Sequence, residues 1–311
     1  MGVYRRFMEE WMAMPVVTGQ KSESEKFAGA LRTYACEAMM QDNRALQAGT
    51  SHNLGQNFAK AFDLTFQSEA GTIEHAWNTS WGVSTRMIGG LIMTHGDDNG
   101  LVCPPKLAPV EVVIVPIYRK DEERAQVLEV AERIRAEIGG RERGLEDRVS
   151  VHIDARDGVK PGAKYYHWEL KGVPLRLEIG PRDVASNQCV LVRRDTRAKQ
   201  VVSLDGLLGT VHALLDTMQG DLFAAATARR EANSHRNVRS YDELRQIMEG
   251  PGGFVYAGWN GDPAVEARVK EETKATIRCI PDPEFRSAEA PARCLVTGEP
   301  AKHEVIWARA Y

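Results

Sequence analysis

The chain carries Gln47-Ala48-Gly49-Thr50-Ser51-His52 and, further on, Ser80-Trp81-Gly82-Val83-Ser84-Thr85-Arg86-Met87-Ile88-Gly89-Gly90. The first stretch sets an amide, hydroxyls and an imidazole beside a glycine. Taken alone, such a cluster is also typical of a turn whose polar groups are satisfied locally. The second stretch contains an arginine, Arg86, which is followed by an apolar segment from Met87 to Met93. An arginine at the start of a buried helix can lie against a purine ring and offset phosphate charge, so a nucleotide site is one of the two interpretations.

The size and composition of the chain indicate a soluble protein of several domains. Its 311 residues are enough for two or three hydrophobic cores, and 43% hydrophobic with 27% charged residues is ordinary for a globular protein. No apolar run approaches the ~20 residues that a membrane helix needs. Met1 begins no recognisable signal peptide. We therefore expect a cytoplasmic protein with no membrane partner.

The charge pattern gives no global sign of nucleic-acid binding, because the net charge is −3. An RNA partner would have to bind to local basic patches, and no DNA partner is expected. Two patches are candidates, although solvated surface charge is the alternative that charge alone favours. They are Arg193, Arg194, Arg197 and Lys199 in one, and Arg229, Arg230, His235, Arg236 and Arg239 in the other.

The cysteines indicate neither a disulfide framework nor a zinc ribbon. There are five of them, scattered along the chain without a Cys-x-x-Cys pair. We expect reduced, mostly buried thiols. They are Cys36, Cys103, Cys189, Cys279 and Cys294.

Hydrophobic periodicity divides the chain at a proline-rich linker, residues 101–110. Before it, a helix is expected over 3–14. After it, the pattern predicts a small α/β domain and then a long helix over about 207–236. The elements predicted within the α/β domain are a strand at 112–117, a helix at 121–138, a strand at 151–154, a helix at 164–171, and strands at 173–179 and 189–192.

Several motifs together are similar, nearly residue for residue, to prolyl-tRNA synthetases of the archaeal/eukaryotic type. The resemblance covers the whole chain and is strongest over residues 1–117. It rests on Lys26-Phe27-Ala28-Gly29-Ala30, the run from Ala45 to Phe58, Thr79-Ser80-Trp81-Gly82, His95-Gly96-Asp97, Pro104-Pro105 and Ala108-Pro109.

The resemblance implies a multidomain fold of the α/β and α+β classes. Residues 1–100 would form part of a class II synthetase catalytic domain built on an antiparallel sheet, motif 3 included. Residues 111–205 would form a βαβαβ anticodon-binding domain, and residues 206–311 a small α+β C-terminal module. The implied reaction activates L-proline with ATP and Mg²⁺ to prolyl-adenylate and transfers the prolyl group to tRNA(Pro).

The proline pocket that the resemblance implies lies around His52, a catalytic candidate whose donor would hold the substrate carbonyl. Phe27 matches an aromatic wall of that pocket, which suits an imino acid without a polar side chain. Trp81 and Gly82 match its floor, where a glycine allows close approach of the backbone.

The implied ATP site uses Gln47 and Thr50, with Gln47 also near the magnesium ion. Ser84 and Arg86 match the ATP-holding residues of motif 3. Arg86 matches the class-defining catalytic arginine, whose fixed guanidinium would stabilise charge that builds on the phosphates.

Anticodon recognition is implied for Glu169, Arg176 and Glu178. An arginine can read guanine edges, a carboxylate can accept from guanine N–H groups, and proline anticodons contain consecutive guanines. The alternative is an ion pair on an exposed sheet face.

One departure from the family concerns zinc, which many members hold with four cysteines. The matching positions here are Asn260, Val265, Cys294 and Thr297. A valine cannot bind a metal, and one thiolate is too few, so we expect no zinc.

In family members, motifs 1 and 2 lie ahead of the position of Met1. We therefore expect a fragment that is inactive alone, and a homodimer for the intact enzyme that is doubtful for this chain. The alternatives are a non-catalytic protein that binds the anticodon of tRNA(Pro), or a subunit that complements a separate N-terminal piece.

Overall fold

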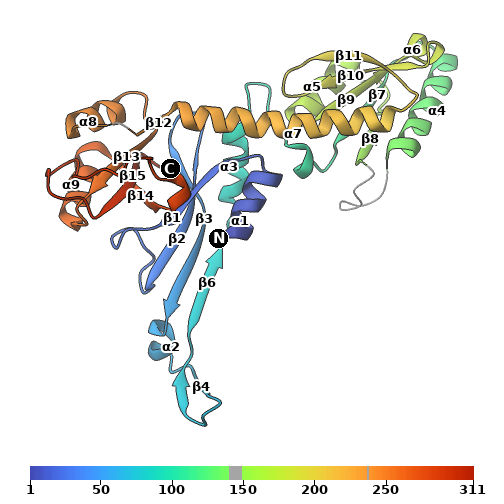
Figure 1. The fold of residues 1–311 in the computed structure, drawn as a ribbon. Coiled ribbons are helices and arrows are strands. Elements are labelled where there is room, and N and C mark those ends of the chain that lie inside the picture. Colours follow the sequence, from blue (N-terminus) through green and yellow to red (C-terminus); the bar gives the residue numbers. More distant parts are fainter. Residues whose placement is uncertain (140–148, 237) are drawn as a thin grey trace. The chain divides into compact units, whose positions relative to one another are not determined.

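The structure is a computed structural model and describes residues 1–139, 149–236 and 238–311. Contacts divide these residues into two compact units (Figure 1). The first unit comprises Met1–Glu10, Met14–Thr94 and Ala226–Tyr311. The second unit comprises Trp11–Ala13 and His95–Ala225.

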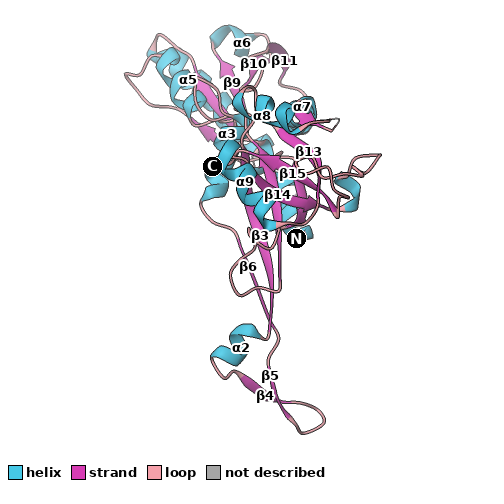
Figure 2. Cartoon of the chain, turned by 90° about the vertical axis from the view of Figure 1, so that its left-hand side faces the viewer, coloured by secondary structure: helices cyan, strands magenta, loops and turns pink. Residues whose placement is uncertain are grey.

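The first unit is built on a sheet of eight strands among the described residues, in the order β12-β13-β15-β14-β1-β2-β3-β6. Figure 2 shows β3 and β6 running out toward the small β4–β5 hairpin and α2. The strands are β1 (Val16–Gln20), β2 (Arg32–Met39), β3 (Ala45–Gly55), β4 (Thr65–Gln67), β5 (Ile73–His75), β6 (Asn78–Gly82), β12 (Ser234–His235), β13 (Phe254–Trp259), β14 (Thr276–Pro281) and β15 (His303–Ala308). The helices are α1 (Gly2–Arg6), the π-helical turn η1 (Phe7–Trp11), α2 (Asn57–Ala61), α3 (Arg86–His95), α8 (Tyr241–Glu249), α9 (Pro263–Thr273) and the 3₁₀ turn η3 (Pro283–Phe285).

Strands from the two ends of the chain meet where β1 pairs antiparallel with β14. Gly19 permits this close approach, because a Cβ atom there would lie 2.3 Å from the carbonyl oxygen of Ile280. A buried cluster packs Val17 of β1 and Met39 of β2 with Tyr256 of β13 and Ile306 of β15. Residues expected in separate N-terminal and C-terminal modules therefore share one sheet, and the functional boundaries stay a prediction.

The second unit contains a five-stranded sheet, again counting the described residues alone, in the order β11-β10-β9-β7-β8. Strand β7 is parallel to β8 and β9, whereas β10 is antiparallel to β9 and β11. The strands are β7 (Val112–Pro116), β8 (Val151–Ile153), β9 (Leu175–Ile179), β10 (Gln188–Arg193) and β11 (Lys199–Ser203). The helices are the 3₁₀ turn η2 (Pro105–Leu107), α4 (Asp121–Ile138), α5 (Pro161–Leu170), α6 (Pro181–Ala185) and α7 (Leu207–Ala232), the last of which continues into the first unit.

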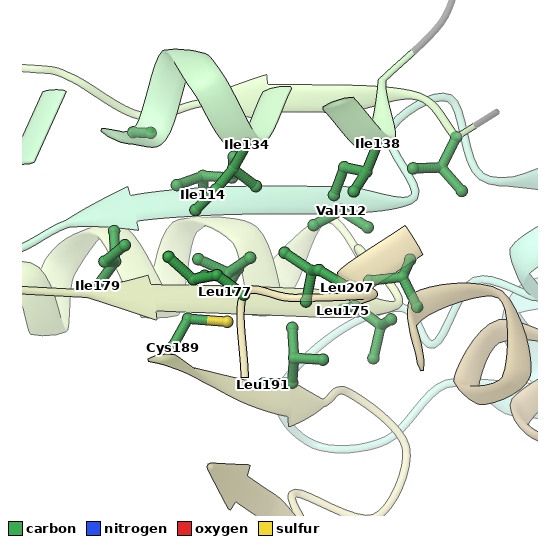
Figure 3. Close-up of a cluster of buried hydrophobic side chains, with 14 of the residues drawn as sticks. Val112, Ile114, Ile134, Ile138, Leu175, Leu177, Ile179, Cys189, Leu191 and Leu207 are labelled. Carbon is green, nitrogen blue, oxygen red and sulfur yellow. The ribbon is translucent and has the colours of Figure 1, made fainter. Parts of the chain in front are cut away.

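The core of the second unit follows from the alternation of strand side chains. Leu175, Leu177 and Ile179 of β9 are buried with residues of α4 and α7 (Figure 3). The opposite face packs Val113 and Val115 of β7 against α5. The predicted strand–helix–strand–helix–strand order is confirmed, and residues 140–148 of that region lie outside the described residues.

Two predicted helices end earlier than expected. The helix expected over 3–14 has α-helical form only to Arg6 and continues as a π-turn to Trp11. The long helix α7 ends at Ala232 rather than near 236, because the next residues leave it to pair with β13. Asn233 marks the end, where its side-chain amide donates to the carbonyl of Arg229.

Candidate functional site

The side chains of Gln47, Thr50 and His52 share one face of β3, which we call the β3 face. Residues three apart in a regular strand point to opposite faces. Here the register with β2 shifts, so that Cys36 pairs with Gly49 while Glu37 pairs with Gln47. The extra residue is a β-bulge that returns Gln47 to the side of Thr50 and His52.

The other face of β3 is covered by helices of the first unit. A Cβ atom at Gly49 would lie 3.2 Å from the side chain of Met8, and one at Gly90 of α3 would lie 2.8 Å from Leu46. The sheet at β3 therefore has one apolar face, which helices cover, and one polar face, the β3 face.

His52 is held on the β3 face by neighbours from β2 and the preceding loop. The hydroxyl oxygen of Thr33 lies 2.9 Å from His52 Nδ1, and the Phe27 ring lies 4.9 Å from the imidazole between centroids. Burial lowers the pKa of His52 from its usual value, so the imidazole is neutral near pH 7. An aromatic ring and a neutral imidazole suit an apolar substrate that also carries a hydrogen-bonding group.

Strand β6 contributes to the β3 face through its register. Gly82 lies opposite Thr50, and Ser80 lies opposite His52. Trp81 pairs with Ser51, and since opposite residues share a face, its side chain belongs to the other side of the sheet. The role of Trp81 in a proline pocket stays a prediction that this register does not support. Gly82 shares the β3 face with Thr50, and its role in the pocket also stays a prediction.

Arg86 lies at the start of α3, beside Gln47. The backbone N–H of Arg86 donates to the Ser84 hydroxyl at 3.3 Å, which caps the helix. Its guanidinium donates to the carbonyl oxygen of Gln47 at 3.4 Å and remains exposed to solvent. A guanidinium beside a helix N-terminus attracts phosphate groups.

A second cluster lies on β9 and α5 of the second unit, around Arg176. Arg176 is 7% exposed and donates to Glu178 at 2.9 Å and to Glu169 at 2.6 Å. The three predicted residues are thus brought together, as an ion-paired group that is mostly buried rather than on an exposed face. Glu169 keeps 31% of its side chain exposed, against 12% for Glu178, and is therefore the better placed acceptor for a ligand.

Sequence reasoning missed Tyr165, whose ring lies 4.0 Å from the Arg176 guanidinium. Burial, together with the Glu178 carboxylate, raises the pKa of Tyr165 to about 12, so the phenol stays neutral. The signal for it was the helical spacing from Tyr165 to Glu169, which places both on one side of α5.

Most arginines of the two basic patches are held by partners of their own. Arg194 is 4% exposed and pairs with Asp97, while Arg193 pairs with Asp195 and Asp221. Hydrogen bonds from Arg194, opposed by burial, hold the pKa of Asp97 well below its usual range. In the other patch, Arg229 donates to the carbonyl of Thr94, and Arg236 lies over the Tyr256 ring. Arg197 and Lys199 keep about 60% of their side chains exposed.

Comparison with known proteins links both clusters to one family. Residues 111–214 match a family model described as an anticodon binding domain, and residues 241–311 match one described as prolyl-tRNA synthetase, C-terminal. A proline--tRNA ligase of Chloroflexus aurantiacus is 54% identical over 312 residues, and one of Chlorobium phaeobacteroides is 52% identical over 314 residues. A third, from Flavobacterium johnsoniae, is 49% identical over 312 residues. By these matches, the chain corresponds to the C-terminal part of prolyl-tRNA synthetases.

The alignments cover 99% of the chain in the first two of these prolyl-tRNA synthetase relatives and 100% in the third. The chain spans 61–63% of the length of the relatives themselves. Among the described residues, no helix is long and apolar enough to cross a bilayer.

The four positions expected to match zinc ligands of prolyl-tRNA synthetases have other contacts here. Val265 and Cys294 are buried in one hydrophobic cluster. The Asn260 amide donates to Glu299 at 2.7 Å, and the Thr297 hydroxyl donates to the same carboxylate oxygen at 3.2 Å. Over the described ranges, no group of three or more His, Cys, Asp or Glu side chains is arranged for a metal. These donors do not fit zinc, and its absence stays a prediction.

The β3 face fits ATP with Mg²⁺ only in part. Gln47 offers an amide oxygen, a ligand type that Mg²⁺ accepts. Mg²⁺ usually takes most of its remaining ligands from phosphates and water, so one protein oxygen is compatible with it. Gln47 would then be an auxiliary ligand, and Arg86 the main protein charge facing the phosphates.

Proposed function

We propose that the protein to which this chain belongs is a proline--tRNA ligase, which activates L-proline with ATP and Mg²⁺ and transfers it to tRNA(Pro). One observation supports this most directly. The bulge in β3 places Gln47, Thr50 and His52 on one face, and Arg86 donates to the Gln47 carbonyl at its edge. The identity to proline--tRNA ligases gives independent support.

In this proposal, the nucleotide lies at the Arg86 end of the β3 face. Arg86 balances phosphate charge as the proline carboxylate attacks, and Ser84, Gln47 and Thr50 hold the ATP. When bound, Mg²⁺ supplies further positive charge to the phosphates, with Gln47 near it. Catalysis then depends on positioning and on charge stabilisation.

Proline lies at the His52 end. Phe27 forms an apolar wall, His52 donates to a substrate oxygen, and Gly82 gives room for the imino acid ring. Trp81 remains a weaker candidate, because its register places it on the other side of the sheet.

We also propose that this chain does not activate proline alone. Phe27 is 48% exposed, and Arg86 is exposed as well, so the described residues do not enclose a substrate. Strand β6 is an edge of the described sheet, with all its residues after Asn78 exposed. Adenylate formation needs exclusion of water, which this open face does not provide.

The test is proline-dependent exchange of pyrophosphate into ATP by this chain. The variants are Arg86→Ala and, as a matched control, Arg6→Ala, whose side chain is exposed on α1. A folded chain without exchange agrees with the account. Exchange that falls about 10²–10³-fold in Arg86→Ala would support the site and disprove the inactivity of the chain alone. Exchange that Arg86→Ala leaves unchanged would contradict the assigned site.

A second proposal is that the second unit binds the anticodon of tRNA(Pro). The Arg176 group supports it, because Tyr165 offers a ring and Glu169 an exposed acceptor beside a fixed guanidinium. Single-stranded bases are recognised by stacking and by hydrogen bonds to their edges. On this view the chain would function as a tRNA-binding protein or as a subunit that complements an N-terminal piece. A homodimer for the intact enzyme and a cytoplasmic location belong to the first proposal, that of a proline--tRNA ligase.

A further inference from the structure

Thr33 makes a buried contact that neither the motifs nor the family match identified. It lies in β2 directly opposite His52 and is 2% exposed. Its hydroxyl oxygen accepts the backbone N–H of Phe27 at 3.0 Å and lies 2.9 Å from His52 Nδ1. One hydroxyl therefore connects the two residues assigned to the proline site.

The hydrogen bonds of this hydroxyl determine which imidazole nitrogen carries the proton. A hydroxyl has one hydrogen and two lone pairs, and the Phe27 N–H occupies one lone pair. If Nδ1 were protonated, it would take the second lone pair and leave the hydroxyl hydrogen without an acceptor. Among the described residues, this oxygen makes no other hydrogen bond, and the 2% exposure of Thr33 leaves little access for water.

We infer that Thr33 is a positioning residue, which donates to Nδ1 of His52 and fixes the neutral imidazole as the Nε2–H tautomer. This arrangement satisfies the Phe27 N–H, the hydroxyl hydrogen and the bare Nδ1 nitrogen together. It leaves the Nε2–H group as a donor on the β3 face. The lowered pKa of His52, caused by burial, agrees with a neutral ring.

The consequence for substrate binding rests on the proposed function. His52 serves as a hydrogen-bond donor to a carbonyl or carboxylate oxygen, and its bare nitrogen, held by Thr33, takes no proton from the substrate. The same hydroxyl fixes the Phe27 backbone, so Thr33 couples the apolar wall of the pocket to its donor.

The test is nuclear magnetic resonance of the full chain with ¹⁵N-labelled histidine near neutral pH. Two-bond ¹H–¹⁵N correlations distinguish protonated from bare ring nitrogens, and His52→Gln identifies the His52 signals among the eight histidines. We expect a bare Nδ1 and a protonated Nε2 in the wild type. A wild-type His52 that is protonated at Nδ1, or that mixes the two tautomers, would overturn the inference.

Two variants separate the hydroxyl from the shape of the side chain. Thr33→Ser keeps the hydroxyl, so His52 should keep the Nε2–H tautomer. Thr33→Val keeps the shape but removes the hydroxyl, so the Nε2–H tautomer of His52 should no longer predominate. An unchanged tautomer in folded Thr33→Val would disprove the positioning role. If Thr33→Val does not fold, the wild-type and Thr33→Ser spectra still decide.

Addition of L-proline to the same samples separates the inference from the proposed function. A change at the Nε2 signal of His52 supports both. An Nε2–H tautomer that proline does not perturb supports the role of Thr33 and counts against the binding of proline by this chain alone.

Discussion

Glu37 of β2 accepts two hydrogen bonds from Arg278 of β14, at 3.0 and 2.8 Å, although 241 residues separate them along the chain. Its other carboxylate oxygen accepts from Lys21 at 2.8 Å, and Glu37 is fully buried. These hydrogen-bonded ion pairs connect β2 and the residue after β1 to β14, next to the pairing of β1 with β14.

Removal of the Glu37 charge should destabilise the first unit strongly. Glu37→Gln keeps the shape but leaves Lys21 and Arg278 as buried cations without a counter-charge. We expect a loss of about 3–5 kcal/mol in the free energy of unfolding, measured by urea denaturation. Arg268→Ala removes the exposed pair with Glu272 and should change stability far less, because solvent screens the two charges. Equal effects of the two variants would show that the buried group does not join the strands.

Glu266 of α9 should make stability depend on pH. It is 2% exposed, accepts from the Ser22 hydroxyl at 2.7 Å, and has a second carboxylate oxygen, Oε2, without a partner among the described atoms. Burial raises its pKa above the usual 4.5. The folded chain therefore binds more protons than the unfolded chain between these two pKa values, and stability falls as pH rises through that window.

The matched variant is Glu266→Gln, which is neutral at every pH. It should be more stable than the wild type at neutral pH, with the difference shrinking as pH falls through the raised pKa toward 4.5. Thermal melts of both proteins across this range measure the effect. A difference that grows toward acid pH would have the wrong sign for a raised pKa.

Metal removal should leave the fold intact. Only Cys294 among the four family positions could bind zinc, and Glu299 already joins Asn260 and Thr297. We expect the same melting temperature with and without a strong chelator, and no stoichiometric zinc by elemental analysis. A chelator-induced loss of several degrees, restored by zinc, would show that the chain holds a metal after all.

The sequence predicted the second unit well because its pattern is local. The apolar run at 112–117 and the helical spacing over 121–138 needed no knowledge of partners. The end of α7 was wrong by a few residues, because β13 competes for the chain after Ala232.

The β3 face could be predicted only through the family motifs. Spacings of three and then two residues from Gln47 to His52 place them on one face only if a bulge intervenes, and the bulge is a property of pairing with β2. The contact of Thr33 with His52 was likewise not predictable, because it depends on which residue of β3 lies opposite Thr33. The face on which Trp81 lies depends in the same way on its pairing with Ser51. The family resemblance had grouped Glu169 and Glu178 with Arg176. The burial of Arg176 against Tyr165 was not predictable from β9 alone, because Tyr165 lies on α5.

The most direct test of the account is the binding of tRNA(Pro) by this chain at fixed salt, compared with the same tRNA carrying changed anticodon guanines. We predict that the chain prefers the natural anticodon, and that Glu169→Gln weakens this preference by about 1–3 kcal/mol per lost base contact. Glu129→Gln, on the distant helix α4 of the same unit, is the matched control and should leave the preference unchanged. Equal affinity for both tRNAs in the folded wild-type chain would contradict the account.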